Sequence, residues 1–216
     1  MTDKNVSRPH SGLHVRAIDA TLRLIAELQV YRPSVGDVAA QLDVSEDYLR
    51  AIFPDEDSLL IAAAEQALVR LIDECTRSVV KVDPDDPVAQ FNALGDAYLE
   101  WADHYRAQFR LISDSRLVDT LNVPSLRRYL DSVSDLMERL LQRAKDRGQL
   151  HPNEDICMIV VSARTFAFGV ACMIVDDRMA AWLPGSDQVE AGKRLTHDFV
   201  RRMARSSQVR PATSDH

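Results

Sequence analysis

The sequence has little glycine and few aromatic side chains: seven of its 216 residues are Gly, and Phe, Trp and Tyr together make up 6%. It also has no convincing run of alternating polar and apolar residues, the pattern typical of a half-buried β-strand. Long segments rich in Ala, Leu, Val, Glu, Asp and Arg favour helices instead. Apolar residues make up 46% of the chain, ample for a packed core. We therefore expect an all-α protein of about nine helices.

The motifs of the common enzyme classes are missing. The chain has no G-x-S-x-G, no phosphate-binding P-loop, no H-E-x-x-H and no Gly-rich dinucleotide turn. Its six histidines are scattered, and His104 has no Cys or carboxylate at metal-ligand spacing. We expect no enzyme, no cofactor and no metal site.

Cysteine is scarce as well. Cys75, Cys157 and Cys172 show no Cys-x-x-Cys spacing and lie in apolar segments. This pattern predicts buried, reduced thiols in a cytoplasmic protein. The first residues, MTDKNVSRPHSG, lack the apolar core of a signal peptide.

One long apolar segment raises the question of a membrane span. Residues 156–175 read ICMIVVSARTFAFGVACMIV, with Arg164 near the centre and the acids Asp155, Asp176 and Asp177 at the ends. A central Arg costs about 2.5–3.5 kcal/mol on insertion scales, and no cationic anchor flanks the segment. A helix buried on most sides, in a bundle or a subunit interface, explains the segment better.

Local capping signals divide the first 60 residues into short helices. Ser34 and Asp37 have the spacing of a capping box, which predicts a helix starting there. Asp43 suits a left-handed turn residue, and Ser45 is a natural N-cap for the next helix. Val44 can pack on Leu49 as a hydrophobic staple.

The remaining helices follow from apolar spacing and from Pro and Gly boundaries. A polar segment at 1–11 and a polar tail after 206 flank them. A broken stretch carries Phe109, Leu111 and Ile112, and Ser186 is expected to cap the last helix. The predicted longer helices are about 13–30, 55–80, 87–105, 124–148, 153–179 and 187–205.

The first part of the chain resembles the amino-terminal domain of the tetracycline-repressor (TetR/AcrR) family. The resemblance runs from about residue 13 to residue 75, and beyond it only helix number and order agree. The residues that carry it are Ile18, Leu22, Val38-Ala39, Leu42-Asp43-Val44-Ser45, Leu49, Phe53-Pro54 and Leu59-Leu60.

The resemblance implies a helix-turn-helix DNA-binding domain at 1–55, with a flexible arm at 1–11. It further implies a helical effector-binding and dimerisation domain at 56–206, with a disordered tail at 207–216. The implied function is a homodimeric regulator, a repressor, that binds an operator through residues 34–53 and dimerises through helices around 156–179 and 187–205. The implied DNA-binding residues are Ser34, Val35, Ser45, Tyr48 and Arg50. The implied effector-pocket residues are Trp101, His104, Tyr105, Phe109, Arg164 and Phe168.

The charge of the predicted DNA-binding domain has the wrong sign for DNA. Residues 1–60 hold six Lys and Arg against ten Asp and Glu, a net −4, and the whole chain carries −7. The family usually has Lys at the position of Glu56, where it contacts a phosphate, and has no acid at Glu46. Phosphate contacts supply most of the nonspecific affinity for DNA. Arg50 is the residue here best able to hold a phosphate or read guanine.

Three interpretations of these acids remain open. Glu46 and Asp47 lie in a first helical turn, where carboxylates favour the helix dipole. Either could instead accept a hydrogen bond from cytosine, or the acids could repel DNA and favour a basic partner. The amino-terminal cations could enter a minor groove or stay solvated; they are Lys4, Arg8, His10, His14 and Arg16.

A cation inside an apolar helix needs a partner, which makes Arg164 informative. An internal acid (Asp96, Glu100 or Glu138), an anionic ligand or an acid of the facing subunit could supply it. The alternative to a DNA-binding regulator is a dimeric protein of the same shape that has lost operator recognition and binds small molecules or proteins.

Overall fold

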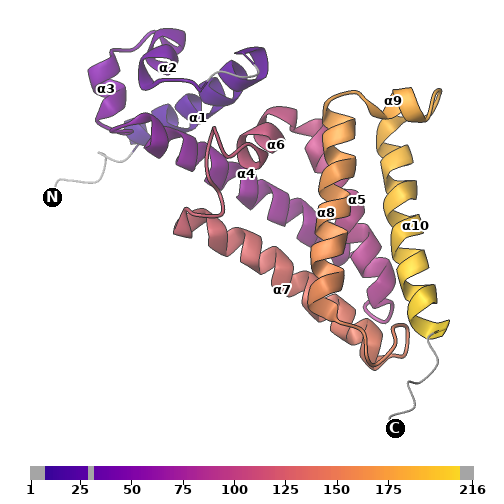
Figure 1. The fold of residues 1–216 in the computed structure, drawn as a ribbon. Coiled ribbons are helices and arrows are strands. Elements are labelled where there is room, and N and C mark those ends of the chain that lie inside the picture. The colour runs from indigo at the N-terminus through magenta and orange to yellow at the C-terminus, as the bar shows by residue number, and fades with distance from the viewer. Residues whose placement is uncertain (1–7, 29–31, 210–216) are drawn as a thin grey trace, which may run out of the picture. The chain divides into compact units, whose positions relative to one another are not determined.

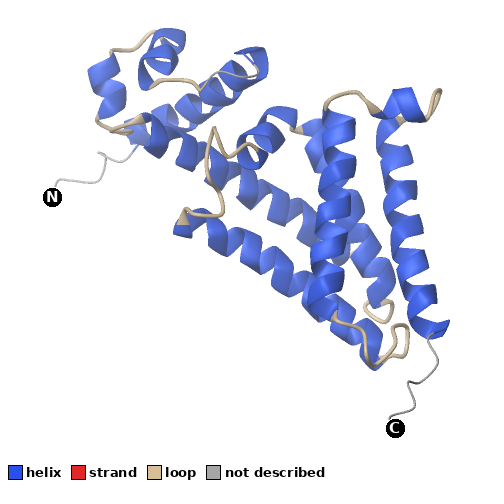
Figure 2. Ribbon diagram, in the orientation of Figure 1, coloured by secondary structure: helices blue, strands red, loops and turns tan. Residues whose placement is uncertain are grey.

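The computed structural model describes residues 8–28 and 32–209, and every regular element within those ranges is a helix (Figures 1 and 2). This confirms the predicted all-α class, with ten helices where about nine were expected. The helices are α1 (Arg8–Leu28), α2 (Val35–Leu42), α3 (Glu46–Arg50), α4 (Glu56–Val79), α5 (Pro87–His104), α6 (Arg106–Ser113), α7 (Pro124–Asp146), α8 (Ile156–Val175), α9 (Met179–Trp182) and α10 (Gln188–Val209).

The chain forms two compact units. Unit 1 combines residues 1–70 with residues 105–129, and unit 2 combines residues 71–104 with residues 130–216. Unit 1 therefore contains α1, α2, α3, the first part of α4 and α6, whereas unit 2 contains α5, α8, α9, α10 and most of α7.

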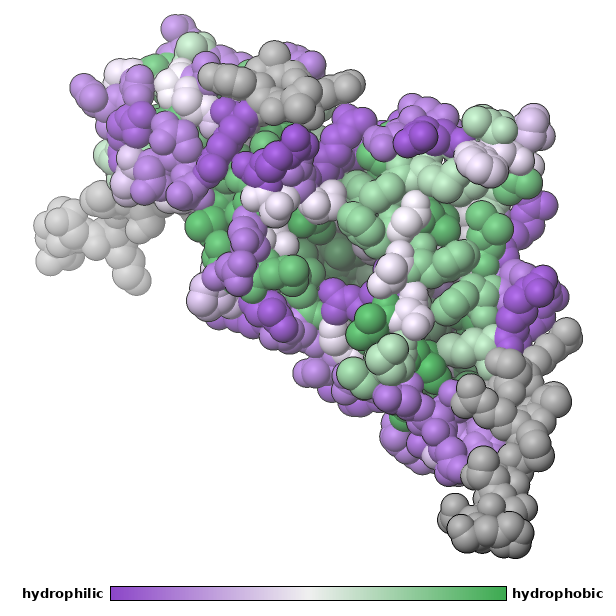
Figure 3. All heavy atoms as spheres, in the orientation of Figure 1, coloured by the Kyte–Doolittle hydropathy of each residue, from purple (hydrophilic) through white to green (hydrophobic). Residues whose placement is uncertain are grey.

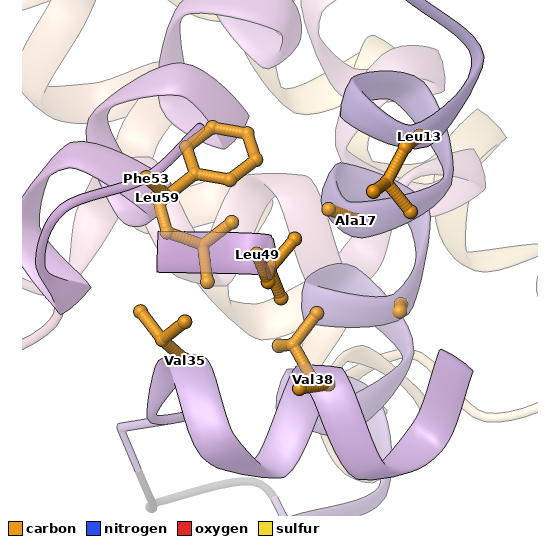
Figure 4. Close-up of a cluster of buried hydrophobic side chains, with 9 residues drawn as sticks. Leu13, Ala17, Val35, Val38, Leu49, Phe53 and Leu59 are labelled. Atoms are coloured by element: carbon orange, nitrogen blue, oxygen red, sulfur yellow. The ribbon is translucent and has the colours of Figure 1, made fainter. Parts of the chain in front are cut away.

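A small apolar core holds α1, α2 and α3 together in unit 1 (Figure 4). Val35 and Val38 of α2 pack against Leu49 of α3 and against Leu13 and Ala17 of α1. The full buried set is Leu13, Ala17, Ala20, Val35, Val38, Ala39, Leu49, Phe53 and Leu59. Ile18 and Leu22, which carry the family resemblance, are also buried but lie outside this cluster, as does Ile25. Helix α1 has a second neighbour in α6.

The predicted caps of this region are confirmed. The Ser34 hydroxyl accepts a hydrogen bond from the Asp37 backbone N–H, and the Asp37 carboxylate accepts one from the Ser34 N–H at 2.9 Å. Asp43 adopts the left-handed conformation with φ 54°. Ser45 caps α3 by accepting from the Tyr48 N–H. Val44 packs, partly buried, against the cluster that contains Leu49.

In unit 2, α5, α8 and α10 pack against one another. Gly192 of α10 lies tightly against the other two helices, because a Cβ built on it would lie 2.8 Å from Ile174 of α8 and 3.3 Å from Leu99 of α5. Two polar contacts link α5 and α10: an ion pair of Glu100 with Lys193 at 2.6 Å, and a hydrogen bond between the Asp96 carboxylate and His197 Nε2 at 2.8 Å.

Three predicted features differ from the structure. Residues 106–113, predicted as a broken stretch, form α6. The single helix expected at 153–179 ends at Val175, because Asp177 turns into the left-handed region with φ 54°, and α9 follows. The first turn of α10 is capped by Asp187, whose carboxylate accepts from the Glu190 N–H at 2.9 Å, and not by Ser186.

Helix α8 is the one helix of the described chain whose length and apolar composition would allow a membrane span. Of its most apolar stretch, 39% is buried. Its exposed residues recur at helical spacing: Cys157, Met158, Val161, Ser162, Thr165, Phe168 and Gly169. Figure 3 shows apolar residues gathered over α8 and α10. The predicted burial on most sides is therefore not met within a single chain, and one apolar face of α8 is left open.

Candidate nucleic-acid interface

The predicted DNA-facing residues lie at the start of α2 and in α3 with its cap, and they differ in exposure. Ser45 is exposed and Tyr48 is 42% exposed. Ser34 is partly buried, with its hydroxyl engaged in the capping box. Val35 is fully buried, so only its backbone could meet DNA.

Arg50, the predicted phosphate or guanine ligand, is 38% exposed and donates hydrogen bonds to three groups of its own domain. Its Nε donates to Glu46 at 2.7 Å, one turn earlier on α3. Its two Nη atoms donate to the Pro54 carbonyl at 3.0 Å and to Glu56 at 3.2 Å. One guanidinium therefore lies between two carboxylates.

The two acids that hold Arg50 also lie at the amino terminus of α2. Glu56 accepts a hydrogen bond from the Val35 N–H at 3.3 Å with the oxygen that contacts Arg50. The other oxygen of Glu46 lies 3.0 Å from the position of a Cβ on Gly36, in the first turn of α2. A helix amino terminus attracts anions because its first N–H groups are unpaired and the helix dipole is positive there.

Neighbouring groups keep this cluster charged. Hydrogen bonds from its own backbone N–H and from that of Val35 lower the pKa of Glu56, and the Arg50 guanidinium lowers it further. A second cation is held in the same way, since Arg32 pairs with Asp57 at the start of α4. The first-turn acids of α4 thus neutralise two of the six cations in residues 1–60.

The amino-terminal cations have different positions. Lys4 lies outside the described residues. Helix α1 begins at Arg8, so Arg8 and His10 belong to a helix rather than to the predicted arm at 1–11. The His14 ring packs on Phe53 with centroids 4.9 Å apart, whereas Arg16 is exposed.

The predicted effector-pocket residues fall in both units. Tyr105 and Phe109 belong to unit 1, where the Arg70 guanidinium lies 4.7 Å from the Tyr105 ring centroid and Phe109 is buried. The other four belong to unit 2, where they differ in exposure. Trp101 is fully buried, His104 is exposed at the end of α5, Phe168 is 42% exposed on the open face of α8, and Arg164 is partly buried.

Arg164 does not have the internal acid partner considered most favourable from the sequence. Its guanidinium donates to the Ser134 hydroxyl of α7, and no carboxylate of the described chain lies within ion-pair distance. Asp96 and Glu100 pair with α10 instead, and Glu138 is exposed.

The Tyr98 hydroxyl lies in the same interior as Arg164. Burial raises the pKa of Tyr98, and the charge of Arg164 acts against that rise. Unit 2 therefore contains a cation without an acid partner whose charge acts on a partly buried phenol.

The cysteines follow the prediction only in part. Cys75 is buried, and that burial, with the charge of Glu74, raises its pKa to about 12. Cys172 is partly buried, but Cys157 is exposed on the open face of α8. The prediction of three buried thiols is wrong for Cys157, because only one side of α8 is covered.

Residues 91–199, just over half of the chain, match the family model of the tetracycline repressor-like carboxy-terminal domain. The chain belongs to the TetR family. No curated protein matches the sequence.

Several solved structures have the same fold. A protein of unknown function from Rhodococcus sp. RHA1 is 22% identical, with 93% of this chain and 100% of that chain covered and a TM-score of 0.76. The TetR-family transcriptional regulator PfmR from Thermus thermophilus is 18% identical, with 87% and 97% covered and a TM-score of 0.67. The ketosteroid transcriptional regulator KstR2 of Mycobacterium tuberculosis is 15% identical, with 90% and 94% covered and a TM-score of 0.64. At these identities the likeness concerns the fold alone.

In the helix-turn-helix region of this TetR-family chain, the pairing of Arg50 with Glu56 was missed from the sequence. The Glu46–Arg50 spacing of four residues on one helix is a signal for the first ion pair. Glu56 lies on the next helix, beyond Pro54, so its approach depends on the turn geometry. The family resemblance marked Glu56 as unusual without giving it a partner.

Proposed function

We propose that the protein is a homodimeric transcriptional repressor that binds a DNA operator through residues 34–53 and responds to a small-molecule effector in its carboxy-terminal part. The observation that carries the proposal is the capped α2–turn–α3 unit, with Ser45 and Tyr48 exposed on α3. A helix-turn-helix places its second helix in the major groove. Membership of the TetR family supports a cytoplasmic, non-enzymatic regulator.

The dimer is proposed to form through the open face of α8 together with α10. Met158, Val161 and Phe168 are 58%, 51% and 42% exposed, and Leu195 of α10 adds to them. Large apolar side chains that are exposed next to one another mark an interaction surface. A second copy of the chain would cover them and place two copies of α3 on two operator half-sites.

The effector is proposed to carry an anionic group that pairs with Arg164. A partly buried cation without an acid partner favours an ionised ligand, because ion pairing offsets the cost of removing the charge from water. The hydroxyl of Ser134 already orients the guanidinium. Binding there would favour one dimer arrangement and so alter operator affinity.

Titration with fragments of the source genome at several salt concentrations tests the DNA-binding part. We expect retention of particular fragments, with an affinity that falls as salt rises. No retention even at low salt would rule out a DNA-binding repressor.

A second candidate function is a TetR-like dimeric protein that no longer recognises an operator and acts through ligands or protein partners. The engagement of Arg50 by Glu46 and Glu56 favours it, because the main predicted phosphate ligand is already neutralised. The same titration separates the two, since this candidate retains no fragment while still forming a dimer.

A further inference from the structure

The cluster of Glu46, Arg50 and Glu56 satisfies two groups that DNA phosphates also use. Arginine guanidinium groups and the N–H groups at helix amino termini are common phosphate contacts in protein–DNA complexes. Here the guanidinium of Arg50 and the N–H of Val35 both donate to one oxygen of Glu56, at 3.2 and 3.3 Å. Glu56 therefore lies where an oxygen of a phosphate could bind.

Glu46 completes the arrangement from the other side. It accepts from Arg50 Nε at 2.7 Å, and its second oxygen lies beside Gly36 in the first turn of α2. Two carboxylates and one guanidinium give a net charge of −1 at this point. A phosphate approaching Arg50 meets an excess of negative charge as long as both acids keep their places.

The neighbouring acids lack these contacts. Asp43 and Asp47 belong to the same turn and helix and are exposed, and neither side chain has an ion pair within the described residues. Glu46 and Glu56 therefore differ from the neighbouring acids in their contacts with Arg50 and the start of α2, and not merely in adding negative charge.

We propose that Glu46 and Glu56 act as an internal substitute for DNA phosphate, which sets the DNA affinity of the domain by occupying Arg50 and the amino terminus of α2. DNA must displace Glu46 or Glu56 before a phosphate can take over the N–H groups that Arg50 now donates to them, and a phosphate at the remaining exposed N–H groups still meets the charge of both acids. An operator is therefore bound strongly only where other contacts compensate for that exchange, and nonspecific DNA is held weakly. This inference rests on the proposed DNA-binding function.

The experiment measures binding of a fluorescently labelled mixed-sequence duplex of roughly 30 base pairs, by anisotropy, from about 50 to about 200 mM salt. The test variant of the full chain is E46Q/E56Q. Gln removes the charge but keeps an oxygen that can accept from the Val35 N–H. The matched control is D43N/D47N, which removes two charges from the same turn and helix without touching Arg50, and Asn tolerates the left-handed turn at position 43.

Each of the three backgrounds is also made with R50A, which forms a mutant cycle. We expect E46Q/E56Q to bind more tightly than the wild type, with a slope of log affinity against log salt steeper by about 0.9 as Arg50 gains one phosphate. R50A should abolish that gain. In the wild type and in D43N/D47N, R50A should change affinity and slope little.

If E46Q/E56Q and D43N/D47N raise the DNA affinity equally, and R50A has the same effect in every background, the internal-substitute proposal is wrong. The proposal of a DNA-binding repressor is not affected by that result. Binding by no variant at the lowest salt would overturn both proposals. Thermal melts followed by circular dichroism identify a variant that has lost its fold. If a double variant is unfolded, the single variants E56Q and D47N repeat the comparison with one charge removed from each.

Discussion

At the scale of single residues, the amino-terminal domain depends on side chains that close helix ends. Ser34 and Asp37 exchange hydrogen bonds at the start of α2, so two otherwise unpaired N–H groups are satisfied. This contact fixes where α2 begins and therefore how α3 is presented.

Ser34→Ala should destabilise the protein by about 1 kcal/mol, the usual cost of losing an N-cap. Denaturant unfolding measures the change. Ser115→Ala is the matched control, because Ser115 is an exposed serine of unit 1 whose hydroxyl makes no hydrogen bond within the described chain. Equal stability of the two variants would contradict a stabilising role for the Ser34 cap.

The same contact gives unfolding a pH dependence. Hydrogen bonds from the Ser34 hydroxyl and then from its backbone N–H lower the pKa of Asp37 below the ordinary value of 3.8. The folded chain therefore binds this proton less readily than the unfolded chain, so the stabilisation is present above pH about 4 and is lost as the pH falls through the lowered pKa. Melting temperatures of the wild type and Asp37→Asn should converge below that range, and a constant difference would contradict this origin.

Local signals made these residues predictable, and distance along the chain made others unpredictable. The Ser34–Asp37 and Ser45–Tyr48 contacts span three residues, so spacing alone is informative. Arg164 meets Ser134 across 30 residues, and a hydroxyl partner for a guanidinium leaves no pattern in the sequence. The exposure of Cys157 likewise depends on which side of α8 the rest of the fold covers.

At the scale of helices, the contact of α5, α8 and α10 depends on a small residue. A Cβ at Gly192 would lie 2.8 Å from Ile174 Cδ1 and 3.0 Å from Val170 Cγ1, both in the buried core. The helices can approach this closely only because Gly192 has no side chain.

Gly192→Ala should therefore destabilise the protein by about 1–3 kcal/mol, as expected for overpacking. Gly95→Ala on α5 is the control, because a Cβ added there would have nothing within 4 Å, and it should be neutral or stabilising by up to about 1 kcal/mol through helix propensity. Thermal or denaturant unfolding of the two variants measures the difference in stability. A stabilising Gly192→Ala would show that the helices can separate freely.

The open face of α8 gives a prediction about association. Val161→Arg places a charge in the centre of the apolar face, so we expect a monomer where the wild type is a dimer, with the far-ultraviolet circular dichroism of the monomer still helical. Analytical ultracentrifugation measures the mass. Glu138→Arg, an exposed change on α7, should leave the dimer intact; dissociation by both variants, or by neither, would exclude α8 as the specific interface.

Helix boundaries show the same limit of sequence reasoning. The long helices α4 and α7 were predicted to within about two residues because they have clear apolar periodicity and Pro or Gly boundaries. The break after Val175 was missed because no Pro or Gly marks it; the left-handed conformation that ends α8 is adopted by Asp177 instead. Helix α6 was missed because eight residues between two turns show too few periods to be distinguished from a loop.

At the scale of the whole molecule, the chain has a TetR-family fold whose helix-turn-helix region is acidic. The fold and its caps present Ser45 and Tyr48 on α3, while Glu46 and Glu56 occupy Arg50. The proposed function requires a dimer, since one copy of α3 of five residues offers few contacts and two copies read two half-sites.

Footprinting of the genomic fragment retained by the wild-type protein tests this central claim most directly. We predict protection of two similar half-sites in inverted orientation, spaced by about one helical turn of DNA or a multiple of it, roughly 10 base pairs or more from centre to centre. The protection should weaken as salt rises. A fragment without paired half-sites, or no retained fragment even at low salt, would contradict a dimeric, operator-binding repressor.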